Sequence, residues 1–414
     1  MFYALAELLQ QYDIPGVGLL HYISFRAGAA FVLALLIAMP LGGRIIHYLR
    51  RHQIGESIRN LGLAGQNEKA GTPTMGGIII VAATLIPVLL LTNLKNVYIV
   101  IMLVSTLWLG ILGAMDDYTK VFAHKKEGIR GRVKIAGQVA LGLFVGTMIF
   151  LSPQIGIRTP TDQVVRNSAE SVDLTTARER AVRLNPVEKS LETTIPFVKN
   201  NELNYRELIP IEGTPGHILA WALFVLVVVF IITAVSNGAN LTDGLDGLAV
   251  GVSVPIATTL GLLAYVSGNI IFANYLRIMY IPNAGELVVF MSAFVGALVG
   301  FLWFNSYPAL VFMGDTGSLT IGGVVAVYAI LVRKELLLPI LCGIFLMESL
   351  SVIVQVGYFK YSRLRTGTGK RLLLMSPLHH HYQKKGMPEP RIVNRFLIIS
   401  LLLAVLTIVT LKIR

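Results

Sequence analysis

Five aspartates lie at the ends of long apolar runs: Asp116, Asp117, Asp243, Asp246 and Asp315. Charged side chains beside a bilayer interior are costly and are kept mostly where a site uses them, so these acids form the candidate active site. Carboxylates held close together stay ionised only when cations compensate them, and oxygen-rich sites favour Mg²⁺ or Mn²⁺. Mg²⁺ readily takes substrate phosphates as ligands, so the pattern predicts phosphoryl transfer at a membrane surface.

The elements that must position these acids are membrane-spanning helices. The chain has 414 residues, of which 54% are hydrophobic and 14% charged, and its mean hydropathy is +0.69, which is too apolar for an ordinary soluble domain. A bilayer core of about 30 Å requires about 20 apolar residues per helix. We therefore expect an all-α polytopic membrane protein, one integral domain over 1–414, with ten spans at about 24–46, 75–94, 97–115, 135–154, 217–236, 248–267, 286–305, 318–333, 336–359 and 396–412.

The distribution of Lys and Arg predicts the orientation of these spans. Most of the cations lie in three groups of loops, at about 44–69, 120–134 and 360–395, which we expect to be cytoplasmic. Ten spans then place both termini on the extracytoplasmic side. The net charge of +12 is concentrated on the inner face, where it can attract anionic lipids or a polyanionic substrate.

Each polar cluster follows an odd-numbered span. Asp116 and Asp117 end the third span, residues 237–246 follow the fifth, residues 305–315 follow the seventh, and residues 379–381 follow the ninth. All odd-numbered spans exit on the same face of the membrane. The clusters must therefore share one side, which we predict to be the cytoplasmic face.

Each cluster also has an ordinary structural explanation. Acids such as Asp116 can simply face water, residues 237–247 are rich in turn formers, and Asp315 can cap the next helix. The histidines at 379–381 cannot all point one way on a helix and have no acid or cysteine at metal-ligand spacing, which excludes a zinc site. Hydrogen bonding to phosphate or base is their expected role. Residues 71–77 lack the spacing of a P-loop.

A polar stretch at about 155–215 interrupts the apolar pattern. Its eight Lys and Arg residues face nine Asp and Glu residues, so it is nearly neutral. This balance is typical of a solvated loop, and we expect an extracytoplasmic insert with one helix around Ser168 to Leu184.

Five runs carry a more specific resemblance: Lys69–Gly77, Asp116–Lys120, Asn237–Gly247, Phe312–Asp315 and Ser376–Gln383. In this order, and over nearly the whole chain, they resemble the polyprenyl-phosphate N-acetylhexosamine-1-phosphate transferases. The triple histidine is most similar to the branch that uses UDP-MurNAc-pentapeptide, because sister enzymes carry a different motif in that loop. The 155–215 insert departs from the shorter loop typical of that branch.

The resemblance implies a multi-pass enzyme of the bacterial cytoplasmic (inner) membrane that joins UDP-MurNAc-pentapeptide to undecaprenyl phosphate, giving lipid I and UMP for peptidoglycan. It implies catalytic roles for Asp116, Asp117 and Asp315, with Mg²⁺ bound by Asp315. The substrate-binding residues that it implies are Lys69, Thr74, Lys120, Lys134, Asn237, Asn240, Asp243, Asp246, Asn305, Phe312, His379, His380 and His381. Membrane lipids, a second copy of the chain and other cell-wall enzymes are partners compatible with this assignment, and no nucleic acid is expected.

Two other functions fit part of the pattern. A sister transferase that uses UDP-GlcNAc would share the acids but not the triple histidine. An ion-coupled secondary transporter also uses intramembrane acids and broken helices, but its site lies near the bilayer midplane. The acids of this chain instead follow the ends of spans, which favours an enzyme at the membrane surface.

Overall fold

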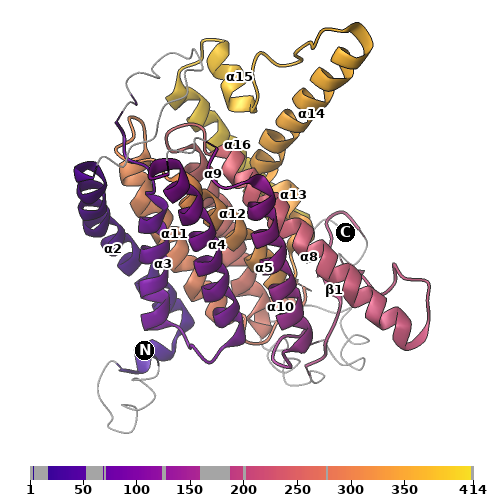
Figure 1. The fold of residues 1–414 in the computed structure, drawn as a ribbon. Helices are drawn as coiled ribbons and strands as arrows, with labels where there is room; N and C mark the ends of the chain where they lie inside the picture. Colours follow the sequence, from indigo (N-terminus) through magenta and orange to yellow (C-terminus); the bar gives the residue numbers. More distant parts are fainter. Residues whose placement is uncertain are drawn as a thin grey trace.

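The computed structural model describes residues 3, 17–52, 69, 71–123, 127–158, 187–198, 202–276 and 278–411. Its principal helices are α2 (Ile23–Arg51), α3 (Gly77–Leu91), α4 (Val97–Val121), α5 (Gly131–Leu151), α8 (Gly213–Thr242), α9 (Leu248–Ser267), α11 (Gly285–Asn305), α12 (Gly314–Leu331), α14 (Gly343–Thr366) and α16 (Glu389–Thr410). Within the described residues, nine of these are long and apolar enough to cross a membrane, and α3 is a shorter apolar helix. The chain is therefore a mostly helical, polytopic membrane protein (Figure 1).

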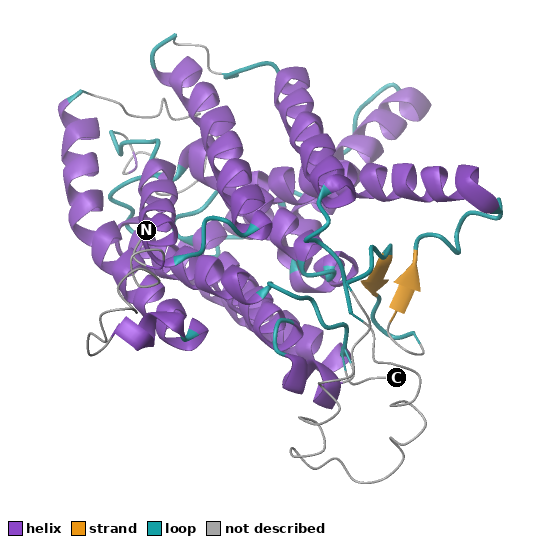
Figure 2. Ribbon diagram, turned by 90° about the horizontal axis from the view of Figure 1, so that it is seen from below, coloured by secondary structure: helices purple, strands orange, loops and turns teal. Residues whose placement is uncertain are grey.

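Short elements join and cover these helices. They are η2 (Val17–His21), β1 (Glu192–Thr194), β2 (Glu202–Asn204), α10 (Ile270–Leu276), η5 (Glu335–Leu337), α13 (Leu338–Leu341) and α15 (Leu378–Lys384). β1 and β2 form an antiparallel pair in which Glu192 lies opposite Asn204, so the insert, which was expected to be a loop with one helix, also contains two short strands (Figure 2). The helix predicted at Ser168 to Leu184 lies outside the described residues.

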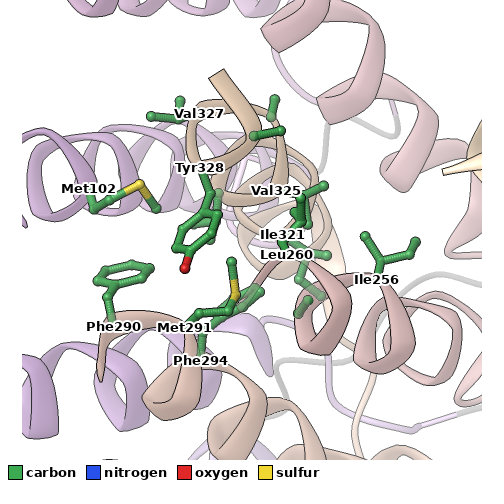
Figure 3. Packing of buried hydrophobic residues seen from close by; sticks show 14 of the residues in the cluster. Met102, Ile256, Leu260, Phe290, Met291, Phe294, Ile321, Val325, Val327 and Tyr328 are labelled. Atoms are coloured by element: carbon green, nitrogen blue, oxygen red, sulfur yellow. The ribbon is translucent and has the colours of Figure 1, made fainter. Parts of the chain in front are cut away.

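The centre of the bundle is α12. Every residue of α12 after Gly314 is buried, and the helix packs against α3, α4, α8 and α9. Large side chains of α4, α9 and α11 fill the space around it, with Tyr328 of α12 pointing toward Phe290 and donating a hydrogen bond to the carbonyl oxygen of Leu287 at 3.0 Å (Figure 3). Lipid is as apolar as these side chains, so close packing holds such helices together more than the hydrophobic effect does.

Small residues allow α2 and α11 to lie against each other. Ala30, Ala34 and Ala38 of α2 recur every fourth residue and are fully buried. Opposite them, a Cβ atom added to Gly296 would lie 2.3 Å from a carbonyl oxygen of α2, and one added to Gly300 would lie 2.5 Å from the Cβ of Ala38. This seam is the small-residue contact that membrane helices use to approach closely.

Several helices extend beyond the apolar runs that predicted them. α4 continues to Val121 and α8 to Thr242, while α12 already begins at Gly314 and α16 at Glu389. Hydropathy marks where side chains stop being apolar, whereas a helix continues as long as neighbouring elements satisfy its polar groups. Asp116, Asp117 and Asp315 consequently lie inside helix ends and not in loops.

The predicted common face exists as one end of the bundle. The last turns of α4 and α8, the first turn of α12 and the whole of α15 lie at this end, with α15 at the top of Figure 1. The β1–β2 pair lies beside the opposite, outward-pointing end of α8 (Figure 2).

Candidate active site

The structure brings together three of the five predicted aspartates. Asp116 and Asp117 come from the end of α4, and Asp315 from the first turn of α12. One carboxylate oxygen from each lies within 4.8 Å of the others, and all three residues are buried. α4 and α12 can approach this closely because residue 113 is glycine, where a Cβ would lie 2.3 Å from the carbonyl oxygen of Asp315.

Two lysines bridge this acidic cluster. The Nζ of Lys120 lies 2.8 Å from Asp116 Oδ2 and 3.0 Å from Asp315 Oδ1. The Nζ of Lys134, from α5, lies 2.9 Å from Asp116 Oδ1 and 2.5 Å from Asp315 Oδ2. Two ammonium groups against three carboxylates leave one negative charge uncompensated when all are ionised. A set of hard oxygen ligands with this excess charge fits a divalent cation such as Mg²⁺.

Asp117 has a different environment from Asp116. Its Oδ1 accepts a hydrogen bond from the backbone N–H of Asp315 at 2.9 Å, and its Oδ2 accepts from the N–H of Thr316 at 2.9 Å and from the Thr316 hydroxyl at 2.6 Å. The first amides of a helix have no partner within the helix, so the Asp117 carboxylate supplies the missing acceptors for α12. Asp117 thereby fixes the backbone that carries Asp315.

α8 contributes one of its two candidate asparagines to the cluster. The Nδ2 of Asn240 donates to Asp315 Oδ1 at 3.0 Å and to the hydroxyl of Ser318 at 2.8 Å. Asn237 instead donates to Gln138 Oε1 on α5 at 2.8 Å. Asn237 therefore joins α8 to α5 and does not contact the acids.

Asp246 belongs to a second charged group. The Nζ of Lys69 lies 2.7 Å from Asp246 Oδ1 and 2.7 Å from Glu389 Oε1, at the start of α16. Asp246 Oδ2 also accepts from the N–H of Ala309 at 3.0 Å. Burial disfavours the charged form of Lys69, but its hydrogen bonds to the two acids outweigh this and raise its pKa above the ordinary value. Lys69 is thus a firmly protonated cation beside the turn that follows α8.

Asn305 holds two loops in place. Its Oδ1 accepts from the N–H of Gly247 at 3.1 Å, and its Nδ2 donates to the carbonyl oxygen of Val311 at 2.9 Å. Both bonds are buried. Asn305 therefore links the turn after α8 to the loop before α12.

The segment before α3 lies along the same loop. The N–H of Phe312 donates to the carbonyl oxygen of Pro73 at 2.8 Å, and the N–H of Gly76 donates to that of Phe312 at 2.9 Å. Thr74, between them, is buried, and Phe312 is half-buried. Asp243, also half-buried, directly follows the last residue of α8.

The three histidines lie on α15, and only the first is fully buried. His379 Nδ1 lies 3.2 Å from Glu348 Oε1 of α14, and Glu348 Oε2 also accepts from the N–H of Leu378 at 2.7 Å. On its other side, His379 contacts residue 244, where a Cβ would lie 2.2 Å from His379 Nε2. His379 therefore packs α15 between α14 and the turn after α8, and this contact requires glycine at position 244.

His380 and His381 are half-buried and uncharged at neutral pH. Burial, followed by the charge of His379, lowers the pKa of His380 to about 4. Burial, followed by the charge of Lys385, also lowers the pKa of His381. These histidines can form hydrogen bonds, but they offer no positive charge to a phosphate.

The sequence reasoning missed several polar residues of this region, including Glu348, Glu389 and Gln383. Glu348 had a clear signal, because it is a single acid within the run predicted as the 336–359 span. Glu389 and Gln383 lie outside every predicted span. Gln383 is three positions after His380, a spacing that makes the two side chains neighbours on a helix, but this required a helix at residues 378–384. No spacing relates Glu389 to Lys69, and that contact is apparent only in three dimensions.

Comparisons with known proteins agree with this arrangement. The family model described as "Glycosyl transferase family 4" matches residues 190–333, and "Phospho-N-acetylmuramoyl-pentapeptide-transferase signature 1" matches residues 69–81. A relative from Flavobacterium johnsoniae is 57% identical, and relatives from Flavobacterium psychrophilum and Parabacteroides distasonis are each 54% identical. All three are named phospho-N-acetylmuramoyl-pentapeptide-transferase, and each match covers 100% of both chains. The matches therefore include the region of the 155–215 insert.

Proposed function

The chain belongs to the phospho-N-acetylmuramoyl-pentapeptide-transferase family, and on this basis we propose that it transfers phospho-MurNAc-pentapeptide from UDP-MurNAc-pentapeptide to undecaprenyl phosphate. The products are lipid I and UMP, and the pathway is peptidoglycan synthesis. The observation that carries this function into the structure is the buried cluster of Asp116, Asp117 and Asp315, bridged by two lysines at one end of the bundle. A site of this composition suits the transfer of a phosphoryl group between two anionic substrates.

The enzyme acts at the cytoplasmic face of the bacterial cytoplasmic membrane in this proposal, with ten spans and both termini outside. Cations of the Lys- and Arg-rich loops support this orientation, because those that the structure describes beside the site lie at the same end of the helices as the acids: Arg50, Lys69, Lys120 and Lys134. The tenth span is α3, whose 15 residues rise only about 22 Å and cross less than the full bilayer core. The buried residues 73–76, which lead into α3, make up part of the difference.

The residues of the acidic cluster fit a bound Mg²⁺. We assign the ion to Asp315, with Asp116 beside it, because both carboxylates face the shared space that Lys120 and Lys134 enter. Asp117 is less suited, since α12 already occupies both of its oxygens. Bound Mg²⁺ would neutralise the diphosphate and stabilise the departing UMP.

The reaction is one displacement at phosphorus. An oxygen of undecaprenyl phosphate forms a bond to the β-phosphorus of the UDP-sugar, while the bond from that phosphorus to the bridging oxygen breaks and its electrons leave with UMP. A phosphate monoester has a second pKa of about 6, so the attacking group is mostly dianionic at neutral pH and requires no strong base. The chain's task is to hold two anions together, which Lys120 and Lys134 do by binding phosphate oxygens.

In this proposal some of the other candidate residues contact the substrate, and the rest hold those residues in place. Lys69, Asp243, Asp246, His380 and His381 line the nucleotide-sugar end. The supporting residues are of two kinds. Asn237, Asn240, Asn305 and the backbone of Phe312 form hydrogen bonds to other parts of the protein. Thr74 and His379 are buried and support the site by packing.

The test uses purified full-length protein in detergent with Mg²⁺, undecaprenyl phosphate and either UDP-MurNAc-pentapeptide or UDP-GlcNAc. We expect UMP release only with the MurNAc-pentapeptide nucleotide. Asp315→Ala should abolish release even with excess metal, whereas Glu207→Gln, an exposed acid on the insert, should match the wild type. Release from UDP-GlcNAc instead would favour the sister transferase, and no release with either would contradict the proposal.

A two-step reaction through an aspartyl phosphate is the mechanistic alternative. Labelled UMP would then exchange into UDP-MurNAc-pentapeptide in the absence of undecaprenyl phosphate. Direct displacement predicts no exchange under those conditions, because UMP leaves only when the lipid phosphate attacks.

A further inference from the structure

The Nδ1 atoms of His380 and His381 have different hydrogen-bond partners. His380 Nδ1 lies 2.7 Å from Gln383 Oε1, whereas His381 Nδ1 accepts from the backbone N–H of Leu374 at 3.1 Å. A neutral imidazole carries one proton, and the partner of one ring nitrogen decides which nitrogen carries it. The backbone amide requires an unprotonated Nδ1 on His381, so the proton of that ring is on Nε2.

The orientation of the Gln383 amide decides which ring nitrogen of His380 carries the proton. Gln383 Nε2 donates to Glu389 Oε1 at 3.1 Å, and the same Glu389 oxygen accepts from Lys69 Nζ at 2.7 Å. An ionised carboxylate offers only acceptors, so the NH₂ group of Gln383 must face Glu389. Its carbonyl oxygen then faces His380 and requires a proton on Nδ1, which leaves Nε2 as an acceptor.

The surroundings keep His380 neutral, so Nε2 stays available. Burial lowers its pKa to about 4, and the electrostatic effects of His379 and Lys69 act in the same direction. The hydrogen bond to Gln383 and the charge of Glu348 raise the pKa by less than this. At neutral pH the half-buried ring therefore keeps an unprotonated Nε2.

We propose that Gln383 and Glu389 are positioning residues that fix His380 as a hydrogen-bond acceptor at Nε2, which recognises an N–H or O–H group of UDP-MurNAc-pentapeptide. The proposal rests on the function proposed above and refines the role of the triple histidine. His380 then contacts a neutral donor of the substrate and not a phosphate oxygen, which has no proton to give. His381 presents the opposite polarity, a donor at Nε2, from the next position of α15.

The first test observes the protons directly. Full-length protein labelled with ¹⁵N only in histidine would be examined by NMR in detergent at pH 7, with the ring signals assigned from their loss in His380→Asn and His381→Asn. We expect a proton on Nδ1 of His380 and on Nε2 of His381. A proton on Nε2 of His380, or on both of its nitrogens, would overturn the proposal.

A variant of Gln383 tests whether its hydrogen bond holds the proton on Nδ1 of His380. Gln383→Leu should remove the preference for Nδ1, because leucine offers no acceptor to that nitrogen. The His381 signal serves as an internal control in each sample. Gln154→Leu is the control variant, because Gln154 is exposed beyond the end of α5 and lies far from α15 along the chain. An unchanged His380 tautomer in Gln383→Leu would show that Gln383 and Glu389 do not set the tautomer.

The second test measures recognition. His380→Asn and Gln383→Leu should each raise the KM for UDP-MurNAc-pentapeptide by about three- to tenfold, the loss of one hydrogen bond, with a smaller change in kcat. The KM for undecaprenyl phosphate should not change in either variant. If Gln383→Leu folds poorly, His380→Asn still decides the question. An unchanged KM for the nucleotide in His380→Asn would contradict the proposal.

The two proposals fail in different ways. If the wild-type protein releases no UMP from UDP-MurNAc-pentapeptide, the proposed function is wrong, yet the NMR experiment still tests whether Gln383 and Glu389 set the tautomer. If the wild-type protein is active and His380 carries its proton on Nε2, only the further inference is wrong.

Discussion

Replacing Asp117 by Asn tests whether this acid acts through α12 or directly on a substrate. In the wild type, one carboxylate accepts three hydrogen bonds from Asp315 and Thr316. Asparagine keeps a single acceptor oxygen, so its NH₂ group must face one of the two backbone N–H groups. We therefore expect Asp117→Asn to destabilise the protein and to displace Asp315.

The expected magnitude follows from the bonds that are lost. A buried amide left without an acceptor costs about 1–3 kcal/mol. Loss of the negative charge at the start of α12 costs a further ~0.3–1 kcal/mol, because negative charges near a helix N-terminus are stabilising. Together these predict a loss of about 1–4 kcal/mol for Asp117→Asn. Thr316→Val removes only the hydroxyl bond and should cost about 1 kcal/mol.

The assay compares thermal unfolding midpoints of the purified variants in detergent with their UMP release. Because Thr316→Val provides an internal scale, the midpoint of Asp117→Asn should fall further than that of Thr316→Val, and its kcat should fall as Asp315 moves. The reasoning would be refuted if Asp117→Asn lost its activity while keeping the wild-type midpoint. That result would assign Asp117 directly to the lipid phosphate.

Three further predictions concern other parts of the chain. Asn305→Ala should lower the unfolding midpoint by the equivalent of about 1–3 kcal/mol, because it leaves the buried N–H of Gly247 unpaired, and should raise the KM for the nucleotide; a variant as stable as the wild type would contradict this. Gly296→Ala should destabilise, since a Cβ there would lie 2.3 Å from a backbone oxygen, whereas Gly251→Ala, with nothing within 4 Å, should be neutral or stabilising in the same melting assay. The folded state holds the pKa of His380 at about 4, below its unfolded value, so His380 stabilises the fold above about pH 6.5 and this contribution is lost as the pH falls toward 4. A pH series of melting midpoints should show a shallower acid decline in His380→Asn.

Much of the fold could be predicted from the sequence because bilayer thickness sets the length of an apolar run. Each predicted span overlaps a helix, from α2 to α16, and α3 is the one that is shorter than the others. The ends of the helices could not be predicted from the apolar runs. The predicted fifth span ended at residue 236, and the turn formers that follow allowed a loop there, yet residues 237–242 continue α8, where Asn240 bonds to Asp315.

The acidic site was predicted in outline and differs in detail. Asp116, Asp117 and Asp315 do gather at one end of the bundle, as the odd-numbered spans required. The partners of each aspartate did not follow from the order of the spans. Capping of α12 was the structural alternative for Asp315, but the carboxylate that accepts from the first amides of α12 is that of Asp117, and the Asp246 carboxylate pairs with Lys69 in a separate group.

The amino-acid sequence alone determined that this chain crosses a membrane several times and that its acids meet on one side, because both follow from counting apolar runs. Only the tertiary structure decided which partner each polar group has. Asp117 bonds to an amide 198 positions away, and Lys69 reaches Glu389 across 320 positions. Hydrogen bonds act over about 3 Å, so they depend on how helices pack and leave no periodic trace in the sequence. The same bonds distinguish an aspartate that supports a helix from one that faces the reaction.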